Sequence, residues 1–502
     1  MNTMMRDHIA IQQQDDVVIA LHDMAPGDTL VLDNGDILTI MNDIPRGHKV
    51  AVHPIQPGQD VIKYGFSIGK ATVPITPGEW IHSHNLHTGL SGTLDYEYQP
   101  ELNWQPRVIP AHLQTFDGYV RPNGEVGIRN EIWIVNTVGC INKTCELLAR
   151  TAHSEMAGRV DGVYHFPHPF GCSQLGDDLE YTRQLLSSLV LHPNAAGVLV
   201  VGLGCENNQI EQFSAGIPEE YAYKIRYLKA QEEEDELEAG MQHLEELVAL
   251  AEQEQRQPLP LSRLKIGLKC GGSDGLSGIT ANPLVGEIAD WIVSAGGTAI
   301  LTEVPEMFGA ETILMNRSAS PEVFGQLVEL INGFKQYFVN HGQNIYENPS
   351  PGNKAGGITT LEEKSLGCTQ KGGHSQVVDV LRYGQRVHQP GLNIVEAPGN
   401  DLVSVTALSA AGAHIVLFTT GRGTPFGGPV PTVKIATQSE LANRKKHWID
   451  YNAGQLLEGQ SMEQVSLDLL ARIVDIASGR CQTNNEQRGF REIAIFKDGV
   501  IL

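Results

Sequence analysis

The sequence predicts an α/β multidomain protein: a small all-β N-terminal module followed by two α/β domains with mainly parallel sheets. The beginning of the chain repeats an apolar–x–Pro–Gly turn before short alternating stretches, as in MAPGDTL (24–30), IQPGQDV (55–61) and ITPGEWI (75–81). From about residue 118, helical stretches alternate with continuous apolar runs such as EIWIVNTV (131–138) and GVLVVGL (197–203). Such runs are typical of buried parallel strands.

The chain has 502 residues, which is too long for a single core. Between residues 91 and 117 it has three prolines and no clear periodicity, and QRQPLPLS (255–262) forms a second break. Further strands are expected at 264–268, 298–303, 393–397 and 414–419. We therefore divide the chain into a β module at 1–92, a linker at 93–117, an α/β domain at 118–256 and a C-terminal α/β domain at 257–502.

Composition excludes several classes of function. The net charge of −23 argues against nucleic acid, because phosphate binding needs a basic surface. The chain has no apolar run long enough to span a membrane, and MNTMMRDHIAIQQQDD lacks the apolar segment of a signal peptide. Seven cysteines in such a chain indicate reduced thiols, so we expect a cytoplasmic protein. An anionic ligand would then need a local cationic pocket or a metal.

Five of the cysteines lie beside glycines. Three of them, Cys140, Cys205 and Cys270, end predicted strands, whereas Cys172 and Cys368 lie in other Gly-flanked turns. Because ligands bind outside the carboxyl ends of parallel strands, we expect the three strand-end thiols on one common rim. The alternative is that small cysteines fill tight space. No CxxC pair is present, which argues against a zinc ribbon or a thioredoxin-type site.

A Gly-rich loop, KCGGSDGLSG, places Lys269, Ser273 and Asp274 before a predicted helix. Backbone N–H groups and the helix dipole in such a loop suit an anion. The GxxxxGK[ST] order of a P-loop is absent, and GLGCEN lacks the features of a dinucleotide fingerprint. Arg422, in TTGRGTPFGGP, suits either a carboxylate clamp or a structural ion pair.

Two other stretches carry residues that could take part in binding or catalysis. The segment 345–375 has little periodicity and includes Lys354 and Lys371, so we expect a long functional loop. In EWIHSHNLHTG (79–89), His82 and His84 are two residues apart and would share one face of a strand, opposite His87. That pair is either a metal site or two polar residues on the wet face of a sheet.

Several of these stretches together resemble the altronate/galactarate dehydratase family. The carrying motifs are GIRNEIWIVNTVGC, FGCSQLGDD, VGLGCENNQ, LKCGGSDGLSGITANP, LTEVPEMFGAE, NPSPGNKAGGITTLEEKSLGCTQKGG and TTGRGTPFGGPVPTVKIATQSEL. The Pro-Gly module ending in IHSHN resembles a SAF domain, a β-clip-like fold. The resemblance implies a hydro-lyase that converts D-altronate to 2-dehydro-3-deoxy-D-gluconate in hexuronate breakdown. It also implies iron(II), with manganese as a substitute. We expect a sugar-acid ligand and a homo-oligomer, a dimer.

The residues fit such chemistry. A divalent metal would stabilise the enediolate that forms on loss of the C2 proton, while a base and an acid move protons. We hypothesise that His82 and His84 are metal ligands, because imidazoles bind iron(II) well. Residues that could complete that site are Cys205, Glu206 and Cys172. The catalytic candidates are Lys269 or His168 as the base, and Arg422. The substrate-binding candidates are Arg129, Ser273, Asp274, Lys354 and Lys371.

Two alternatives stay open at this point. One is a related lyase that acts on galactarate or on a sulfonated hydroxy acid. The other is a non-catalytic sugar-acid sensor, which would bind its ligand without releasing water. The many polar residues in Gly-rich loops fit the sensor less well than an enzyme.

Overall fold

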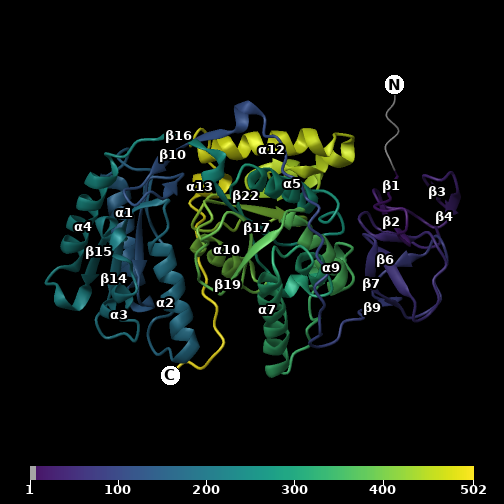
Figure 1. Ribbon diagram of the computed structural model, residues 1–502, viewed down its shortest axis with the longest axis horizontal. Helices are drawn as coiled ribbons and strands as arrows, with labels where there is room; N and C mark the ends of the chain where they lie inside the picture. The colour runs from purple at the N-terminus through teal and green to yellow at the C-terminus, as the bar shows by residue number, and fades with distance from the viewer. Residues whose placement is uncertain (1–6) are drawn as a thin grey trace.

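The computed structural model describes residues 7–502, so residues 1–6 of the predicted module and of the stretch tested for a signal peptide lie outside it. Figure 1 shows three bodies in a row: the N-terminal module at the right, the C-terminal domain in the middle and the second domain at the left. The module has antiparallel strands and each α/β domain has a parallel sheet, which confirms the predicted fold class. No helix of the described chain is long and apolar enough to cross a membrane.

The N-terminal module is built from short strands joined by the Pro-Gly turns. Gly27, Gly58 and Gly78 have φ angles of 94°, 83° and 93°, the left-handed conformation that such turns require of glycine. The strands form three antiparallel sheets, ordered β1-β2-β5-β8, β3-β4 and β6-β7-β9. Their bounds are β1 His8–Ile9, β2 Val17–Ala20, β3 Thr29–Val31, β4 Ile37–Thr39, β5 Lys49–Ala51, β6 Asp60–Lys63, β7 Phe66–Ala71, β8 Trp80–Ile81 and β9 Leu86–His87.

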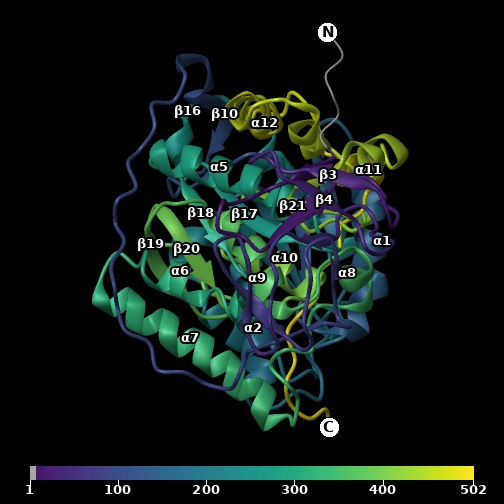
Figure 2. The same ribbon diagram turned by 90° about the vertical axis from the view of Figure 1, so that its right-hand side faces the viewer.

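The segment after the module runs along the C-terminal domain, as Figure 2 shows. It has no helix or strand before the short 3-10 helix η1 (Ala111–Leu113). Polar contacts hold it in place: the Tyr96 hydroxyl donates to Glu311, and the Tyr98 hydroxyl donates to the carbonyl of Ser318 at 2.6 Å. The linker is therefore fixed on the surface of the C-terminal domain.

The second domain has a parallel sheet ordered β13-β12-β14-β15, with α1 and α4 packed on one face and α2 on the other. The sheet interior is aliphatic, as its continuous apolar runs predict. The bounds are β12 Glu131–Asn136, η2 Gly139–Ile141, α1 Asn142–Glu155, β13 Gly162–His165, α2 Gly176–Val190, β14 Ala195–Gly202, α3 Ile210–Ala215, η3 Glu219–Lys224, β15 Ile225–Lys229, η4 Ala230–Glu232 and α4 Glu236–Ala251.

The C-terminal domain has seven strands in the order β19-β20-β18-β17-β21-β22-β23, all parallel. The chain leaves β17 toward β18 and later returns at β21 on the other side, the topology at which ligands bind in open α/β sheets. The strand bounds are β17 Lys265–Cys270, β18 Thr298–Leu301, β19 Val377–Leu381, β20 Gly391–Val395, β21 Ile415–Thr420, β22 Thr432–Ala436 and β23 Tyr451–Asn452, which confirms the four strands expected here.

Helices cover both faces of this sheet. Helices α5, α7 and α12 pack on one face, and α10 packs on the other. The bounds are η5 Leu261–Arg263, α5 Ala281–Ser294, η6 Val304–Met307, α6 Glu311–Met315, α7 Pro321–Asn340, α8 Pro351–Ala355, α9 Leu361–Thr369, η7 Gln370–Gly372, α10 Asp401–Ala410, α11 Ser439–Arg444, η8 Ala453–Glu458, α12 Met462–Ala477 and α13 Asn484–Arg488.

The segment 345–375 is not the long loop that the sequence predicts, because it contains α8 and α9. All nine residues of α9 are buried, including Glu362, Glu363 and Lys364. A helix enclosed on every side has no solvent face, so its sequence shows no amphipathic period. Its charged side chains instead pair with groups brought by other segments.

The two α/β domains are joined by more than one chain crossing. Strand β16 (Gln257–Pro260), in the predicted break at 255–262, pairs with β10 (Thr115–Val120), and β10 also pairs with β11 (Val126–Gly127). One hydrophobic core contains residues of both α2 and α10. In addition, Arg491 forms a buried ion pair with Glu131 of the second domain.

The Arg491–Glu131 pair gives a test of how the domains hold together. Arg491→Ala leaves Glu131 buried without its partner, so we expect a loss of about 3–5 kcal/mol in the free energy of unfolding. Denaturant unfolding followed by circular dichroism measures it. The exposed Arg480, which pairs with Asp475, is the matched control, and Arg480→Ala should cost about 0–1 kcal/mol. Equal losses in the two variants would show that the domain contact does not depend on the buried pair.

Candidate active site at the carboxyl edge of the C-terminal sheet

The central strands of the C-terminal sheet end in a group of charged and sulfur side chains. Strand β17 ends at Lys269 and Cys270, and the segment after β18 supplies Glu303 and Glu306. Glu303 has a φ of 68°, unusual for a residue other than glycine. Backbone strain of this kind persists only where the surrounding structure holds it, often at functional sites.

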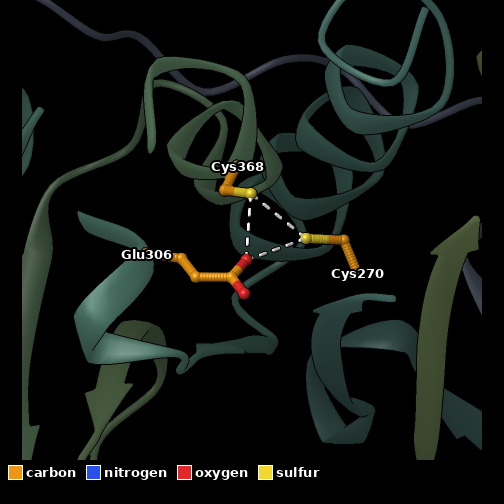
Figure 3. Close-up of side chains that lie close together, drawn as sticks. All are labelled: Cys270, Glu306 and Cys368. Atoms are coloured by element: carbon orange, nitrogen blue, oxygen red, sulfur yellow. Dashed lines mark hydrogen bonds between the residues drawn. The ribbon is translucent and has the colours of Figure 1, made fainter. Parts of the chain in front are cut away.

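Three buried side chains point toward one another in this group (Figure 3). The Sγ atoms of Cys270 and Cys368 lie 3.2 Å apart, and Cys368 Sγ lies 3.2 Å from Glu306 Oε2. Cys270 Sγ lies 3.6 Å from the same oxygen. We call Cys270, Glu306 and Cys368 the thiol–carboxylate group. Cys368 comes from the end of α9, so the group joins three separate segments.

Three buried ammonium groups surround the thiol–carboxylate group. Lys371 Nζ lies 3.0 Å from Cys270 Sγ and 3.1 Å from Glu303 Oε2. Lys364 Nζ lies 2.9 Å from Glu306 Oε1. Lys269 pairs with Glu303 and donates to the carbonyls of Cys270 and Gly399. Buried charges are tolerated only when paired in this way.

The neighbouring charges set the protonation of the group. Burial alone would raise the pKa of Glu306, but Lys364, Lys269 and Lys371 lower it to about 2. The hydrogen bond from Cys368 lowers the pKa of the Cys270 thiol, and the same bond raises the pKa of Cys368. The shared hydrogen bond therefore favours the proton on Cys368 and the negative charge on Cys270.

Two cavities border this group. One, of about 610 Å³, is lined by Pro305, Asn348 and Gly399 together with several aromatic side chains. The Asn348 side chain donates to Glu306 and accepts from Lys364, which connects this cavity to the thiol–carboxylate group. The other is small and polar, and its lining includes Lys63, Ser273, Asp274, Ser277, Glu363, Lys364 and Cys368.

The N-terminal module closes the site from the other side. Lys49 and Lys63, from β5 and β6, both contact the carboxylate of Glu363 in α9, at 2.8 and 2.7 Å. All three side chains are almost completely buried. Lys49 also donates to Thr359 Oγ1, and His82 Nδ1 lies 2.9 Å from the same oxygen. The module therefore reaches the segment that carries Cys368.

The predicted histidine pair lies differently from expectation. Strand β8 ends at Ile81, so His82 and His84 lie in the turn after the strand and not on one strand face. His82 is buried and its burial lowers its pKa to about 4, whereas His84 is exposed and packs against the Trp80 ring. Across residues 7–502, neither belongs to a group of three close His, Cys, Asp or Glu ligand atoms.

The predicted partners of these histidines lie elsewhere. Cys172, Cys205 and Glu206 are on the carboxyl edge of the second-domain sheet, and Figure 1 shows that domain at the opposite end of the molecule from the module. The prediction that Cys140, Cys205 and Cys270 lie on one common rim is also wrong, because Cys270 belongs to the other parallel sheet. The sequence showed strand ends but not which strands share a sheet.

The base candidates have surroundings that restrict their roles. His168, in the second domain, is buried, with Nε2 2.8 Å from the carbonyl of Asn136 and Nδ1 accepting from the N–H of Phe170. Burial lowers its pKa. Lys269 is the opposite case. Burial alone would lower its pKa, but the charges of Glu303 and Asp401 raise it, so the ammonium form is favoured. A charged lysine stabilises negative charge rather than abstracting a proton.

The remaining predicted residues divide into three sets. Ser273 and Asp274 are buried beside the small polar cavity, and Lys371 touches Cys270. Arg129 instead pairs with Glu486, away from both cavities, and donates to backbone carbonyls. Two candidates are exposed near the same edge. They are Arg422, whose N–H bonds the carbonyl of Gly272, and Lys354 on α8.

Sequence reasoning missed the acidic residues of the site. Glu303 and Glu306 directly follow β18, so the strand-end argument used for cysteines would have found them. Glu363 and Lys49 gave no such signal, and Lys63, which does end strand β6, gave no sign of its partner, because the pairing depends on how the N-terminal module docks.

The fold and site define a multidomain α/β protein with a buried thiol, carboxylate and amine site at the carboxyl edge of a parallel sheet. Three family models match the chain: an altronate/galactarate dehydratase SAF domain at 6–89, a D-galactarate dehydratase/altronate hydrolase second domain at 118–252, and a D-galactarate/altronate dehydratase C-terminal domain at 261–501. The chain belongs to the D-galactarate/altronate dehydratase family.

Curated relatives match over almost the whole length. An altronate dehydratase of Escherichia coli (strain K12) is 52% identical over 99% of this chain and 100% of its own length. An altronate dehydratase of Bacillus subtilis (strain 168) is 50% identical over 99% of this chain and 100% of its own. A galactarate dehydratase (L-threo-forming) of Escherichia coli (strain K12) is 34% identical over 95% of this chain and 96% of its own length.

The contact of Glu363 with two lysines gives a test of module docking. Glu363→Gln leaves two buried ammonium groups without a counter-charge. We therefore expect the free energy of unfolding to fall by about 3–5 kcal/mol and amide exchange in β5 and β6 to become faster. Hydrogen–deuterium exchange measures the second effect. Asp60→Asn, which removes the exposed partner of Lys70 in the same module, should change neither.

Docking should also depend on pH. Burial would raise the pKa of Glu363, but Lys49 and Lys63 lower it from 4.5 to about 2. A carboxylate with a lowered folded-state pKa stabilises the structure above its ordinary pKa. Docking should therefore be constant from neutral pH to about 4.5 and weaken as the pH falls toward 2. Protection of the amides in β5 and β6, measured relative to their intrinsic exchange rate at each pH, that stays unchanged across this range would contradict the assignment.

Proposed function

We propose that this protein is a hydro-lyase that removes water from D-altronate to give 2-dehydro-3-deoxy-D-gluconate. The observation that carries the proposal is the identity of 50–52% to two altronate dehydratases over 99% of this chain. Galactarate dehydratase and a sulfolactate sulfo-lyase subunit are more distant, at 34% and 30%. A buried, charged site supports an enzyme over a binding protein.

We propose iron(II) as the metal, held by Cys270, Glu306 and Cys368. The donor set fits, because iron(II) accepts both thiolate and carboxylate ligands, whereas two sulfur donors suit manganese poorly. Binding would release the proton that Cys270 and Cys368 share. When bound, a divalent metal supplies charge stabilisation to the carboxylate and hydroxyl of a 2-hydroxy acid.

The lysines around this group suit an anionic substrate. Lys269 and Lys371 are held in the charged form; Lys269 lies near the carboxyl end of β17, and Lys371, from η7, contacts Cys270 at that end. Fixed ammonium groups in a buried site stabilise negative charge that develops at C2 and on the carboxylate. Lys364 and Glu306 form an ion pair that also contacts Asn348, on the wall of the larger cavity. We propose that the sugar acid enters from that side.

The thiols support a proposal about the cellular setting. All seven cysteines are unpaired and three of them are exposed. Thiols in this state persist in a reducing compartment, so we propose that the protein works in the cytoplasm. A homodimer stays a prediction.

Substrate choice is tested by anaerobic turnover of D-altronate, galactarate and sulfolactate, each with iron(II), manganese(II) or a chelator. We expect 2-dehydro-3-deoxy-D-gluconate from D-altronate with iron(II), less with manganese and none with chelator. Faster release of water from galactarate, or of sulfite from sulfolactate, would assign the protein to the related lyases. Binding of D-altronate without any product would make it a sensor.

The iron ligands are tested by substitution. Cys270→Ser, Cys368→Ser and Glu306→Gln should each weaken iron(II) binding more than about tenfold, since even groups behind the ligands contribute 10–100-fold. Equilibrium dialysis without sulfide measures binding, and turnover is measured alongside. Cys481→Ser, at a partly exposed thiol outside the group, is the control. If His82→Ala and His84→Ala lose iron while these three variants retain it, the histidine site predicted from the sequence replaces this one.

A further inference from the structure

We propose that Cys140, Cys172 and Cys205 bind an iron–sulfur cluster at the carboxyl edge of the second-domain sheet. These cysteines lie in the three loops that follow β12, β13 and β14, which are adjacent strands. All three thiols are exposed, whereas Cys145 in α1 of the same domain is buried. Apolar packing therefore does not account for them.

Hydrogen bonds tie the three loops directly together. The N–H of Gly139 donates to the carbonyl of Phe170 at 2.8 Å, which joins the first loop to the second. The N–H of Asn208 donates to the carbonyl of Gly171 at 3.0 Å, which joins the third loop to the second. Thr137 Oγ1 donates to Glu206 Oε1 at 2.6 Å, which joins the first to the third. Each bond lies within three residues of a cysteine.

The backbone around these cysteines is held in unusual conformations. Cys172 lies between Gly171, with a φ of 100°, and Ser173, with a φ of 57°. Gly204, directly before Cys205, has a φ of 125°. Serine in the left-handed region costs free energy that the rest of the fold must offset. Ser173 is fixed by a bond from its N–H to Asn207 Oδ1 at 2.8 Å, so the second and third loops hold Cys172 in this position.

A buried donor without a partner lies beside Cys172. Gln174 is 1% exposed, and its Oε1 accepts from the N–H of Gly171. Its Nε2 has no hydrogen-bond partner in the described part of the chain. Buried donors are almost always satisfied, so an acceptor is missing here. Cys205 Sγ meanwhile accepts from Gln231 Nε2 at 3.7 Å. Donors of this kind hydrogen-bond the sulfur atoms of iron–sulfur clusters.

The spacing of the thiols argues for a cluster over a single ion. Thiolates around one tetrahedral metal lie about 3.8 Å apart, given metal–sulfur bonds of about 2.3 Å. Among residues 7–502, the ligand groups whose atoms all lie within 4.8 Å do not include these cysteines. In a cluster each thiolate binds a different iron, so a wider spacing is required. The N-termini of α1 and α2 follow Cys140 and Cys172 and favour negative charge there.

Three thiolates leave one iron of a four-iron cluster without a cysteine ligand. Because the thiols are exposed, that iron would face solvent and accept an oxygen ligand. The cluster is separate from the thiol–carboxylate group, which belongs to the other parallel sheet. The inference therefore does not require the proposed function.

The test uses the full chain, purified and handled without oxygen, then reconstituted with sulfide and equal amounts of ferrous and ferric iron, which supply the mixed oxidation state of a four-iron cluster. We expect about four irons and four acid-labile sulfides per chain, a visible charge-transfer band and, after reduction, an electron paramagnetic resonance signal. Cys140→Ser, Cys172→Ser and Cys205→Ser should each lose at least about half of the sulfide, and the triple variant all of it. Cys145→Ser is the matched control and should retain the full amount.

A second measurement covers variants that fold poorly. In the wild-type protein, reconstitution should protect Cys140, Cys172 and Cys205 from alkylation, as read by mass spectrometry, and leave Cys481 as reactive as before. Wild-type protein that binds no labile sulfide, or a triple variant that still binds it, overturns the proposal. Cys270→Ser and Cys368→Ser should retain the sulfide even if turnover is lost, which separates this outcome from failure of the proposed function.

Discussion

The carboxylate of Glu363 is the contact on which the candidate site depends. It lies between Lys49 and Lys63 of the N-terminal module, and all three side chains are removed from water. A buried carboxylate with two ammonium partners fixes the docking geometry, because losing either partner exposes an uncompensated charge. Since Glu363 lies in α9, the same contact fixes the helix that carries Cys368. The β module is thus a structural part of the C-terminal site.

The same rule explains why the C-terminal domain tolerates so many buried charges. Glu303 contacts both Lys269 and Lys371, and Glu306 contacts Lys364, so every acid beside the thiols has an ammonium partner. Buried ion pairs contribute little net stability compared with apolar packing. Their presence here makes sense as preorganisation: a set of fixed charges costs no rearrangement when an anion arrives.

The sequence predicts the sheets well and the site only in part. Buried parallel strands are continuous apolar runs, so β12, β14, β17 and β21 are visible locally. Helix α9 is not, because enclosure on every side removes its periodicity. Ser273 and Asp274 are predicted because their Gly-rich loop follows a strand end, and Lys371 because its segment lacks periodicity. The meeting of Cys270 with Cys368, 98 residues apart, depends on tertiary packing that no local pattern encodes. The histidine pair was placed on a strand that ends one residue too early.

The core shared by α2 and α10 joins the second and C-terminal domains into one rigid unit. Apolar side chains from both domains fill it, and β10 and β16 clamp its upper end as Figure 1 is drawn. Turning one domain against the other would open that core to water, which costs far more than thermal energy supplies. The exposed thiols of the second domain and the buried thiols near α9 therefore keep a constant separation within one chain. A molecule that visits both must leave one and diffuse to the other.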